Sequence, residues 1–399
     1  MKIQRVKFKD IEQVPHLQVN TAFKSSFNGS SPAPFIGRYG YPNVNIGVLS
    51  PQFSGDMTQY DSPRVWNKKQ YAIGKIASLR YGLVNSRSKS NITIHNKSRS
   101  NTFLEICQEV GMAKKSAELE ILLKSKPQLQ LKPEKEIHPF GPQSMMRKAR
   151  ITENTRVDTR VDKVVSDTDL KSVQGIMKLY RKGFEENSLH KLLSVGTLGI
   201  GKQRKLVPTR WSITAVDDTI AKELVKEVKD YQIGEYSCHF GGDWGNYYLL
   251  LFFPDVWSYE LFETYLDLRV NPWSKNGYAY STDYEPYDGR KTYAEETAGG
   301  FYAARLPILE KMKQLQRQGS CLALRFISSE YNVPLGVWVC REASRKSLQE
   351  RPIHFASQEL MITYAKEIIH RKFGFNLDML FNESILLKEL KVQRKLTQF

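Results

Sequence analysis

The residues best suited to chemistry on a phosphate group lie in one run, RKLVPTRWSITAVDD. Arg204, Lys205 and Arg210 could hold a phosphate there, because a guanidinium presents a bidentate fork to its oxygens. Asp217 and Asp218, expected at a strand end, could ligate Mg²⁺ beside a phosphodiester. The structural alternative is that Asp218 caps the helix that it begins and Asp217 pairs with an arginine. Both interpretations stay open at this point.

Two further segments combine glycine with basic side chains. The first, FIGRYGYPNVN, places Arg38 in a shaped loop, which is either a backbone cradle or a turn whose Asn side chains satisfy backbone groups. The second, DGRKTYA, places Arg290 and Lys291 ahead of a helix that begins near Gly299-Gly300. Small residues there would let a ligand or another backbone come close. The alternative is helix packing, with Arg305 in a salt bridge.

The charge balance favours polyanionic partners. The chain has 59 Lys and Arg residues against 42 Asp and Glu, a net charge of +17. Residues 62–104 contain nine Lys or Arg and no Asp or Glu, which makes this stretch the best candidate for contact with DNA. Its members Lys68, Lys69, Arg87 and Lys89 are candidate phosphate contacts. The alternative is a solvated basic loop.

Cysteine and apolar residues narrow the class of protein further. The four cysteines have no zinc-finger spacing, which predicts a reduced, cytoplasmic protein without a metal site. No apolar run approaches the roughly 20 residues of a membrane span, so no membrane partner is expected. No cofactor is expected either, with Mg²⁺ considered only for the catalytic alternative.

The pattern of elements predicts an α+β fold, a mixed sheet with flanking helices and a C-terminal helical extension. Residues 85–101 are expected to form an exposed loop, and 125–163 a long connection. Helices are expected over 66–83, 170–180 (capped at 166–169), 218–229, 256–268, 297–318, 357–373 and 383–392. Strands are expected over 211–216, 235–240, 247–253, 321–327 and 336–340.

The last seven residues, QRKLTQF, follow the pattern Gln-x-x-aliphatic-x-x-aromatic of sliding-clamp peptides. A 3₁₀ turn would place Leu396 and Phe399 on the same side, ready to enter one hydrophobic pocket. Gln393 would hydrogen-bond beside them, and a few such anchors carry most of the affinity. The pattern usually ends in two aromatic residues, and here there is one. The alternative is a frayed helix end.

Together these four segments make the sequence resemble the archaeal Nre DNA-repair family, from about Ser31 to the last residue. The resemblance implies DNA damage repair and binding to the sliding clamp, PCNA, through the C-terminal peptide. Some family members carry a four-cysteine zinc finger at the N-terminus; this chain lacks those cysteines, so zinc is not inferred. The implied location is intracellular and nucleoid-associated, with DNA and other repair proteins as further partners.

The resemblance also gives a domain plan. It comprises a flexible arm over 1–30, an Nre N-terminal-type domain over 31–285, an Nre C-terminal-type domain over 286–390 and the clamp-interacting tail over 391–399. It leaves enzymatic activity open. The alternatives are a metal-dependent nuclease or nucleotide-processing enzyme around Asp217 and Asp218, and a non-catalytic repair scaffold.

Overall fold

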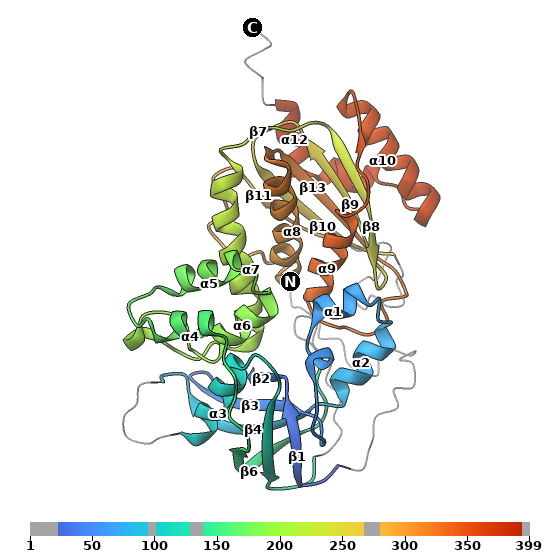
Figure 1. The fold of residues 1–399 in the computed structure, drawn as a ribbon. Helices are drawn as coiled ribbons and strands as arrows, with labels where there is room; N and C mark the ends of the chain where they lie inside the picture. The colour runs from blue at the N-terminus through green and yellow to red at the C-terminus, as the bar shows by residue number, and fades with distance from the viewer. Residues whose placement is uncertain (1–22, 95–100, 128–138, 267–279, 393–399) are drawn as a thin grey trace. The chain divides into compact units, whose positions relative to one another are not determined.

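The structure is a computed structural model that describes residues 23–94, 101–127, 139–266 and 280–392 (Figure 1). Two compact units divide the chain. The N-terminal unit lies within residues 13–220 and 333–336, and the C-terminal unit within 221–332 and 337–399. The division falls inside helix α7 (Thr209–Val228).

A six-stranded sheet forms the centre of the N-terminal unit, in the order β1-β5-β6-β4-β3-β2. Its neighbours are antiparallel except for β4 and β6. Side chains of β5 alternate, so that every second residue from Ala117 to Leu123 is buried, as expected for a strand with one covered face. The strands are β1 (Ser26–Ser31), β2 (Ala33–Ile36), β3 (Asn43–Ser50), β4 (Val84–Asn91), β5 (Ala117–Leu123) and β6 (Gln143–Ile151).

Helices complete the N-terminal unit. Helix α3 begins where the side chain of Asn101 accepts a hydrogen bond from the Leu104 amide, and its apolar residues join the core of the sheet. The helices of this unit are α1 (Pro63–Lys68), α2 (Ile73–Tyr81), α3 (Thr102–Met112), α4 (Thr159–Ser166), α5 (Ser172–Arg181), α6 (Glu186–Ser194) and the first half of α7. Short 3₁₀ turns occupy Thr58–Tyr60 (η2) and Gly201–Gln203 (η3).

The C-terminal unit has its own six-stranded sheet, in the order β11-β10-β13-β9-β8-β14. All eight residues of the central strand β13 are buried, because helices cover both faces. Its strands are β8 (Ser237–Asp243), β9 (Asn246–Phe253), β10 (Ser258–Tyr265), β11 (Tyr280–Glu285), β13 (Ser320–Ile327) and β14 (Ile353–His354). Strands β7 (Gln232–Ile233) and β12 (Arg317–Gln318) form a separate small pair.

Two groups of helices surround this second sheet. Helix α9 packs on β8 and β9 and against α8, while residues of α10, α11 and α12 share an apolar cluster with β9 and β13. The helices are α8 (Gly299–Leu315), α9 (Trp338–Ser347), α10 (Gln358–Phe373), α11 (Asp378–Glu383) and α12 (Ile385–Val392). The expected α+β class is therefore confirmed, including the helical C-terminal region.

Several predicted elements are confirmed within a few residues. They are the strands expected over 235–240, 247–253 and 321–327 and the helices expected over 170–180, 297–318, 357–373 and 383–392. The helix expected over 218–229 lies within α7, which begins nine residues earlier, at Thr209. The apolar residues of these segments agree with their burial, at helical spacing in α10 and almost continuously in α8, β9 and β13, which is why sequence reasoning located them.

Three predictions of element type are wrong. Residues 211–216 belong to helix α7 and not to a strand: Ile213, Val216 and Ile220 are buried at helical spacing. Residues 256–268 contain strand β10 and not a helix, because the pairing of β10 with β11 and β13 decides the conformation. Residues 336–340 open helix α9 and not a strand. Short apolar runs do not distinguish the two conformations.

Four other expectations need correction. The helix expected over 66–83 is two helices, α1 and α2, separated near Gln70, whose φ is 49°. The loop expected over 85–101 begins as strand β4, and the connection over 125–163 contains β6 and α4. The cap expected over 166–169 is displaced, since α5 starts after Lys171. Sheet pairing with distant strands fixes β4 and β6, and a local pattern cannot show it.

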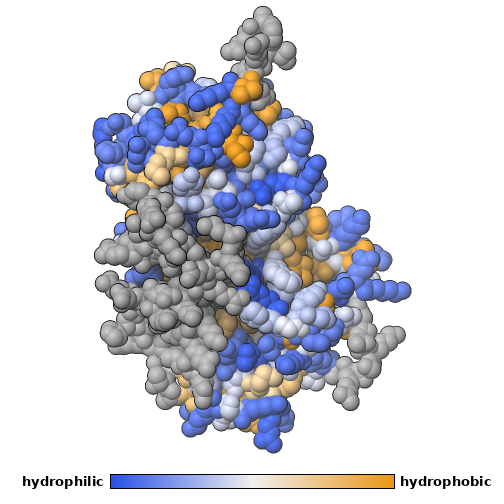
Figure 2. Space-filling model, turned by 180° about the vertical axis from the view of Figure 1, so that it is seen from behind, coloured by the Kyte–Doolittle hydropathy of each residue, from blue (hydrophilic) through white to orange (hydrophobic). Residues whose placement is uncertain are grey.

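On the face drawn in Figure 2, hydrophilic residues make up most of the described surface, and hydrophobic residues appear in several groups between them. Such scattered apolar side chains are normal on proteins and mark no particular partner. Within the described ranges, every helix falls short of the length and apolar character that crossing a membrane requires.

Candidate nucleic-acid interface

Two of the segments singled out in the sequence meet in the N-terminal unit. The amide of Ile36 donates a hydrogen bond to Oγ1 of Thr209, over 2.9 Å. The rings of Tyr41 and Trp211 lie in contact, with centroids 5.7 Å apart and planes tilted by 54°. The FIGRYGYPNVN loop and the start of α7 therefore form one local structure, although 173 positions separate Ile36 from Thr209.

Residue Ile92, just beyond β4, ties the same two segments together through the backbone. Its amide donates to the carbonyl of Pro42 over 2.9 Å, and its carbonyl accepts from the amide of Leu206, also over 2.9 Å. Thr93 forms an isolated bridge with Lys205. Three stretches of chain thus converge, and each brings a basic or aromatic side chain.

The loop between β2 and β3 is shaped by short backbone contacts. Gly37 donates to the carbonyl of Asn45 over 2.7 Å, and Asn43 donates to the carbonyl of Gly40 over 2.8 Å. Gly40 has φ +85°, which favours glycine because other side chains are strained there. The Gly-rich sequence is thereby explained as a tight turn that presents Arg38, Tyr39 and Tyr41.

Three aromatic side chains are unusually exposed on this turn and on α7. The exposed fractions are 56% for Tyr39, 52% for Tyr41 and 45% for Trp211. The guanidinium of Arg38 lies 4.9 Å from the ring centroid of Tyr39, a cation–π contact. Exposed aromatics beside cations are typical of surfaces that bind nucleic acid.

Two exposed lysines, Lys89 and Lys205, belong to the chain segments that meet here. Lys89 on β4 pairs in register with Asn45 on β3. Lys205 comes directly before Leu206, whose amide donates to the carbonyl of Ile92. We call the group the aromatic–basic surface. Its members are Arg38, Tyr39, Tyr41, Lys89, Lys205 and Trp211.

The other basic candidates in this unit have different surroundings. Arg204 donates to the carbonyls of Gly199 and Val165, each over 2.7 Å, so its guanidinium holds the chain together. Arg210 is half-buried beside Trp211. Arg87 donates to Oε1 of Gln143 over 2.8 Å, and burial lowers its pKa.

The described part of the acid-free stretch, 62–94 and 101–104, does not form one surface. Its Lys68 and Lys69 are exposed at the end of α1, whereas Arg64 pairs with Glu186 across 3.0 Å and Arg80 is buried. The stretch therefore divides between surface and interior.

A buried ion cluster surrounds Asp61, which follows η2. Its carboxylate accepts from Arg80 and Lys191, each over 2.5 Å, and from Nδ2 of Asn187 over 2.9 Å. Arg80 also donates through Nε to the carbonyl of Pro139. Because buried charges require such partners, these residues connect α2 and α6 and are not available to a polyanion.

Asp217 and Asp218 lie in α7, so the strand end on which the magnesium hypothesis placed them is absent. Asp217 is buried and Asp218 is half-buried. In the part of the chain that the structure describes, no three His, Cys, Asp or Glu side chains are grouped so as to hold a metal ion.

Arg290 and Lys291 belong to the C-terminal unit. Arg290 pairs with Asp283 across 3.0 Å and donates to the carbonyl of Tyr284 over 2.7 Å, while Lys291 is exposed. Oδ2 of Asp283 also accepts from the amide of Thr297 over 2.8 Å. Arg290 thus fixes the turn that leads into α8.

The glycine and arginine of α8 also pack within this unit. A Cβ at Gly300 would collide with the carboxylate of Glu263, which pairs with Arg325 across 2.5 Å. Arg305 forms a buried ion pair with Glu285. The small residues of this segment therefore do allow a close contact, but the group that approaches the backbone is a side chain of the same unit and not a ligand.

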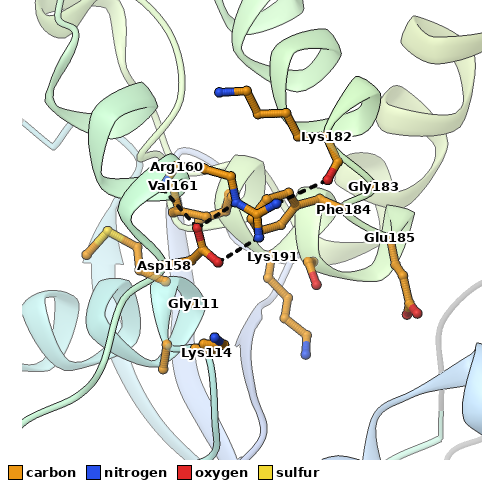
Figure 3. A pocket seen from close by; sticks show the side chains of 14 residues that line it. Gly111, Lys114, Asp158, Arg160, Val161, Lys182, Gly183, Phe184, Glu185 and Lys191 are labelled. Carbon is orange, nitrogen blue, oxygen red and sulfur yellow. Dashed lines mark hydrogen bonds and ion pairs between the residues drawn. The ribbon is translucent and has the colours of Figure 1, made fainter.

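Sequence reasoning did not find a pocket of about 290 Å³ between the end of α3, the start of α4 and the α5–α6 connection (Figure 3). Arg160 lies over the ring of Phe184 at 4.6 Å and pairs with Asp158 across 2.8 Å. Hydrogen bonds from Arg160 hold the pKa of Asp158 well below its usual range. Lys114 adds positive charge to the lining, whereas the charge of Lys191 is balanced by Asp61 and that of Arg160 by Asp158. The sequence marks this place only by Asp158, a residue type that is typical of a helix N-cap, and that signal predicts a helix start and not a pocket.

Comparison with known families places the chain. The family description "Archaeal Nre, N-terminal" matches residues 7–273, and "Archaeal Nre, C-terminal" matches residues 285–399. The chain therefore belongs to the archaeal Nre family, as the motifs predicted. No solved structure matches it.

Curated relatives cover most of the chain. DNA repair protein NreB of Archaeoglobus fulgidus is 34% identical over 349 residues, 87% of this chain and 86% of the relative. DNA repair protein NreA of Haloferax volcanii is 35% identical over 331 residues, 82% of this chain and 78% of the relative. DNA repair protein NreA of Archaeoglobus fulgidus is 31% identical over 346 residues, 86% of this chain and 85% of the relative.

Proposed function

We propose that this protein is a DNA damage repair factor that holds DNA on the aromatic–basic surface and is recruited to the sliding clamp, PCNA, by its C-terminal peptide. The names of three relatives support the repair role. The observation that carries the DNA contact is the convergence of exposed aromatic rings and cations on one folded surface. The proposal also includes other repair proteins as partners and a location at the nucleoid.

Charge supports DNA as the ligand of this surface. Arg38 lies against the ring of Tyr39, and the exposed Lys89 and Lys205 belong to the segments that converge there. Each phosphate contact would release counterions from DNA. Many surfaces that bind single-stranded nucleic acid combine these two elements, cations for the backbone and flat faces for the bases. Lys68, Lys69 and Lys291 are exposed and could add to the field that steers DNA.

The clamp contact depends on Gln393, Leu396 and Phe399, which lie outside the described residues. Its support is the spacing of these three residues together with membership of the Nre family. Lys391, Arg394 and Lys395 near the motif would favour encounter with an acidic clamp surface.

The DNA contact is tested by fluorescence anisotropy of labelled DNA across a salt series. Lys89→Ala and Lys205→Ala are each expected to weaken binding and to reduce the slope of log K against log salt by about one. Lys163→Ala is the matched control, because Lys163 is an exposed lysine of the same unit on α4. Absence of binding at low salt would contradict the DNA part and leave a clamp-tethered scaffold.

A further inference from the structure

We propose that the aromatic–basic surface selects single-stranded DNA over duplex DNA, by stacking unpaired bases on Tyr41 and Trp211. This inference rests on the proposed function, because it names the form of DNA that the same surface takes. It follows from three properties of the rings: their exposure, their relative orientation and the rigidity of the backbone that carries them.

Exposure of these rings contrasts with the burial of aromatic side chains in the core of the unit. Trp66 and Tyr81, which lie on α1 and α2, are almost completely buried, while Tyr39, Tyr41 and Trp211 are about half exposed. Large apolar side chains gathered on a surface usually mark a binding site. Nucleobases are well suited as the ligand, because every base has a π-face and stacking tolerates any sequence.

Orientation leaves ring faces available. Tyr41 and Trp211 meet at a tilt of 54°, so the two rings do not cover each other face to face as a parallel pair would. Arg38 covers one side of Tyr39 and, as a cation next to the turn, is placed to meet a phosphate. Bases and backbone of one strand could therefore be bound at the same time.

The backbone under the rings is held before any ligand arrives. The turn carrying Tyr41 is closed by the hydrogen bonds of Gly37 and Asn43, and Thr209 fixes the start of α7 against Ile36. Binding to a preformed surface avoids the entropic cost of ordering loops. Duplex DNA would gain little from it, since its bases are already stacked and only its phosphates would reach the surface.

The test compares binding of an unstructured oligothymidylate and a hairpin duplex with the same number of phosphates, by competition anisotropy. Tyr41→Ala and Trp211→Ala are each expected to weaken single-strand binding by about 5- to 100-fold, while duplex binding changes less than about twofold. Tyr41→Phe and Trp211→Phe keep the ring and are expected to restore single-strand binding. Phe53→Ala, which removes an equally exposed ring of the same unit, is the control.

A second readout protects against a variant that folds poorly. Oligothymidylate is expected to quench tryptophan fluorescence of the wild type, and this quenching is expected to fall in Trp211→Phe at saturating DNA. Equal loss of single-strand and duplex binding in the alanine variants would overturn the inference, since the rings would then act as a wedge in duplex DNA. Unchanged binding to both would also overturn it and leave the DNA contact intact, whereas no binding to either DNA would overturn the proposed function itself.

Discussion

Burial separates the basic residues of this protein into two groups with different roles. Arg80, Arg305 and Arg325 are buried, and each pairs with a carboxylate in its own unit. Removing one member of such a pair leaves a charge uncompensated in the interior, which is strongly destabilising. Lys89 and Lys205, by contrast, are exposed members of the aromatic–basic surface, so replacing them leaves no buried charge uncompensated. Residue type alone did not distinguish the two groups.

One buried histidine predicts how stability depends on pH. Burial lowers the pKa of the His239 imidazole from 6.5 to about 4. Between these values the unfolded chain binds a proton that the folded chain does not, so the contribution to stability is complete above about pH 6.5 and is lost as pH falls toward 4. The loss is on the order of 3 kcal/mol.

Urea unfolding of wild type and His239→Gln between pH 4 and 7 checks this expectation. The variant is expected to lose stability less steeply as the pH falls across this range. His370→Gln, at an exposed position on α10, serves as the control. Equal slopes for wild type and His239→Gln would contradict the assignment.

At the scale of elements, close packing explains the sequence pattern at the start of α8. Gly300 lies against the carboxylate of Glu263, which reaches α8 from β10 and is held by Arg325 from β13. A second carboxylate of β10, Glu260, accepts from the amides of Ile385 and Leu386, each over 3.0 Å, and so anchors the start of α12. Strand β10 therefore positions helices on both sides of its sheet.

A pair of glycine substitutions tests this packing. Gly300→Ala is expected to lower the free energy of unfolding by about 1–3 kcal/mol, because the new methyl group displaces Glu263. Gly74→Ala on α2 is the matched control: a Cβ there meets nothing within 4 Å. Alanine is a better helix former than glycine, so this control is expected to be neutral or to stabilise by up to about 1 kcal/mol. Chemical denaturation compares the two, and equal effects would contradict the steric explanation.

At the scale of the whole molecule, the two proposed contacts lie in different parts of the chain. The net charge of +17 suits a protein that works on a polyanion. The anchored helix α12 is the last described element before the peptide motif. DNA contact and clamp recruitment are therefore assigned to different parts of the chain and can be removed one at a time.

The clamp assignment predicts a clean separation of binding from stability. Phe399→Ala is expected to abolish binding to purified archaeal PCNA, because buried anchor residues carry most of the affinity of such peptides. The melting temperature and DNA affinity are expected to stay unchanged. Thr397→Ala, at a position that the motif leaves open, is the control in the same calorimetric titration. Full clamp binding by Phe399→Ala would show that the motif interpretation is wrong.

The sequence by itself determined the α+β class, the family and the elements rich in apolar residues. Helix α10 is marked by the spacing that burial of one face imposes, and α8 and β9 by nearly continuous burial. The sequence did not determine β10, whose buried carboxylates Glu260 and Glu263 gave it a helix-like pattern. Only tertiary structure supplies the helices and arginine that make those charges tolerable in a strand.

The candidate site shows the same limit. The basic residues of the FIGRYGYPNVN loop and of the start of α7 could be selected from the sequence, but the exposure of Trp211 could not, because 211–216 was expected to be a strand. The convergence of the two segments could not be predicted either, since it depends on contacts such as Ile36 with Thr209. The sequence likewise suggested Arg204 and Arg290 as phosphate contacts, and the fold directs both to main-chain carbonyls. A local pattern specifies which groups are present; long-range packing decides which of them face solvent.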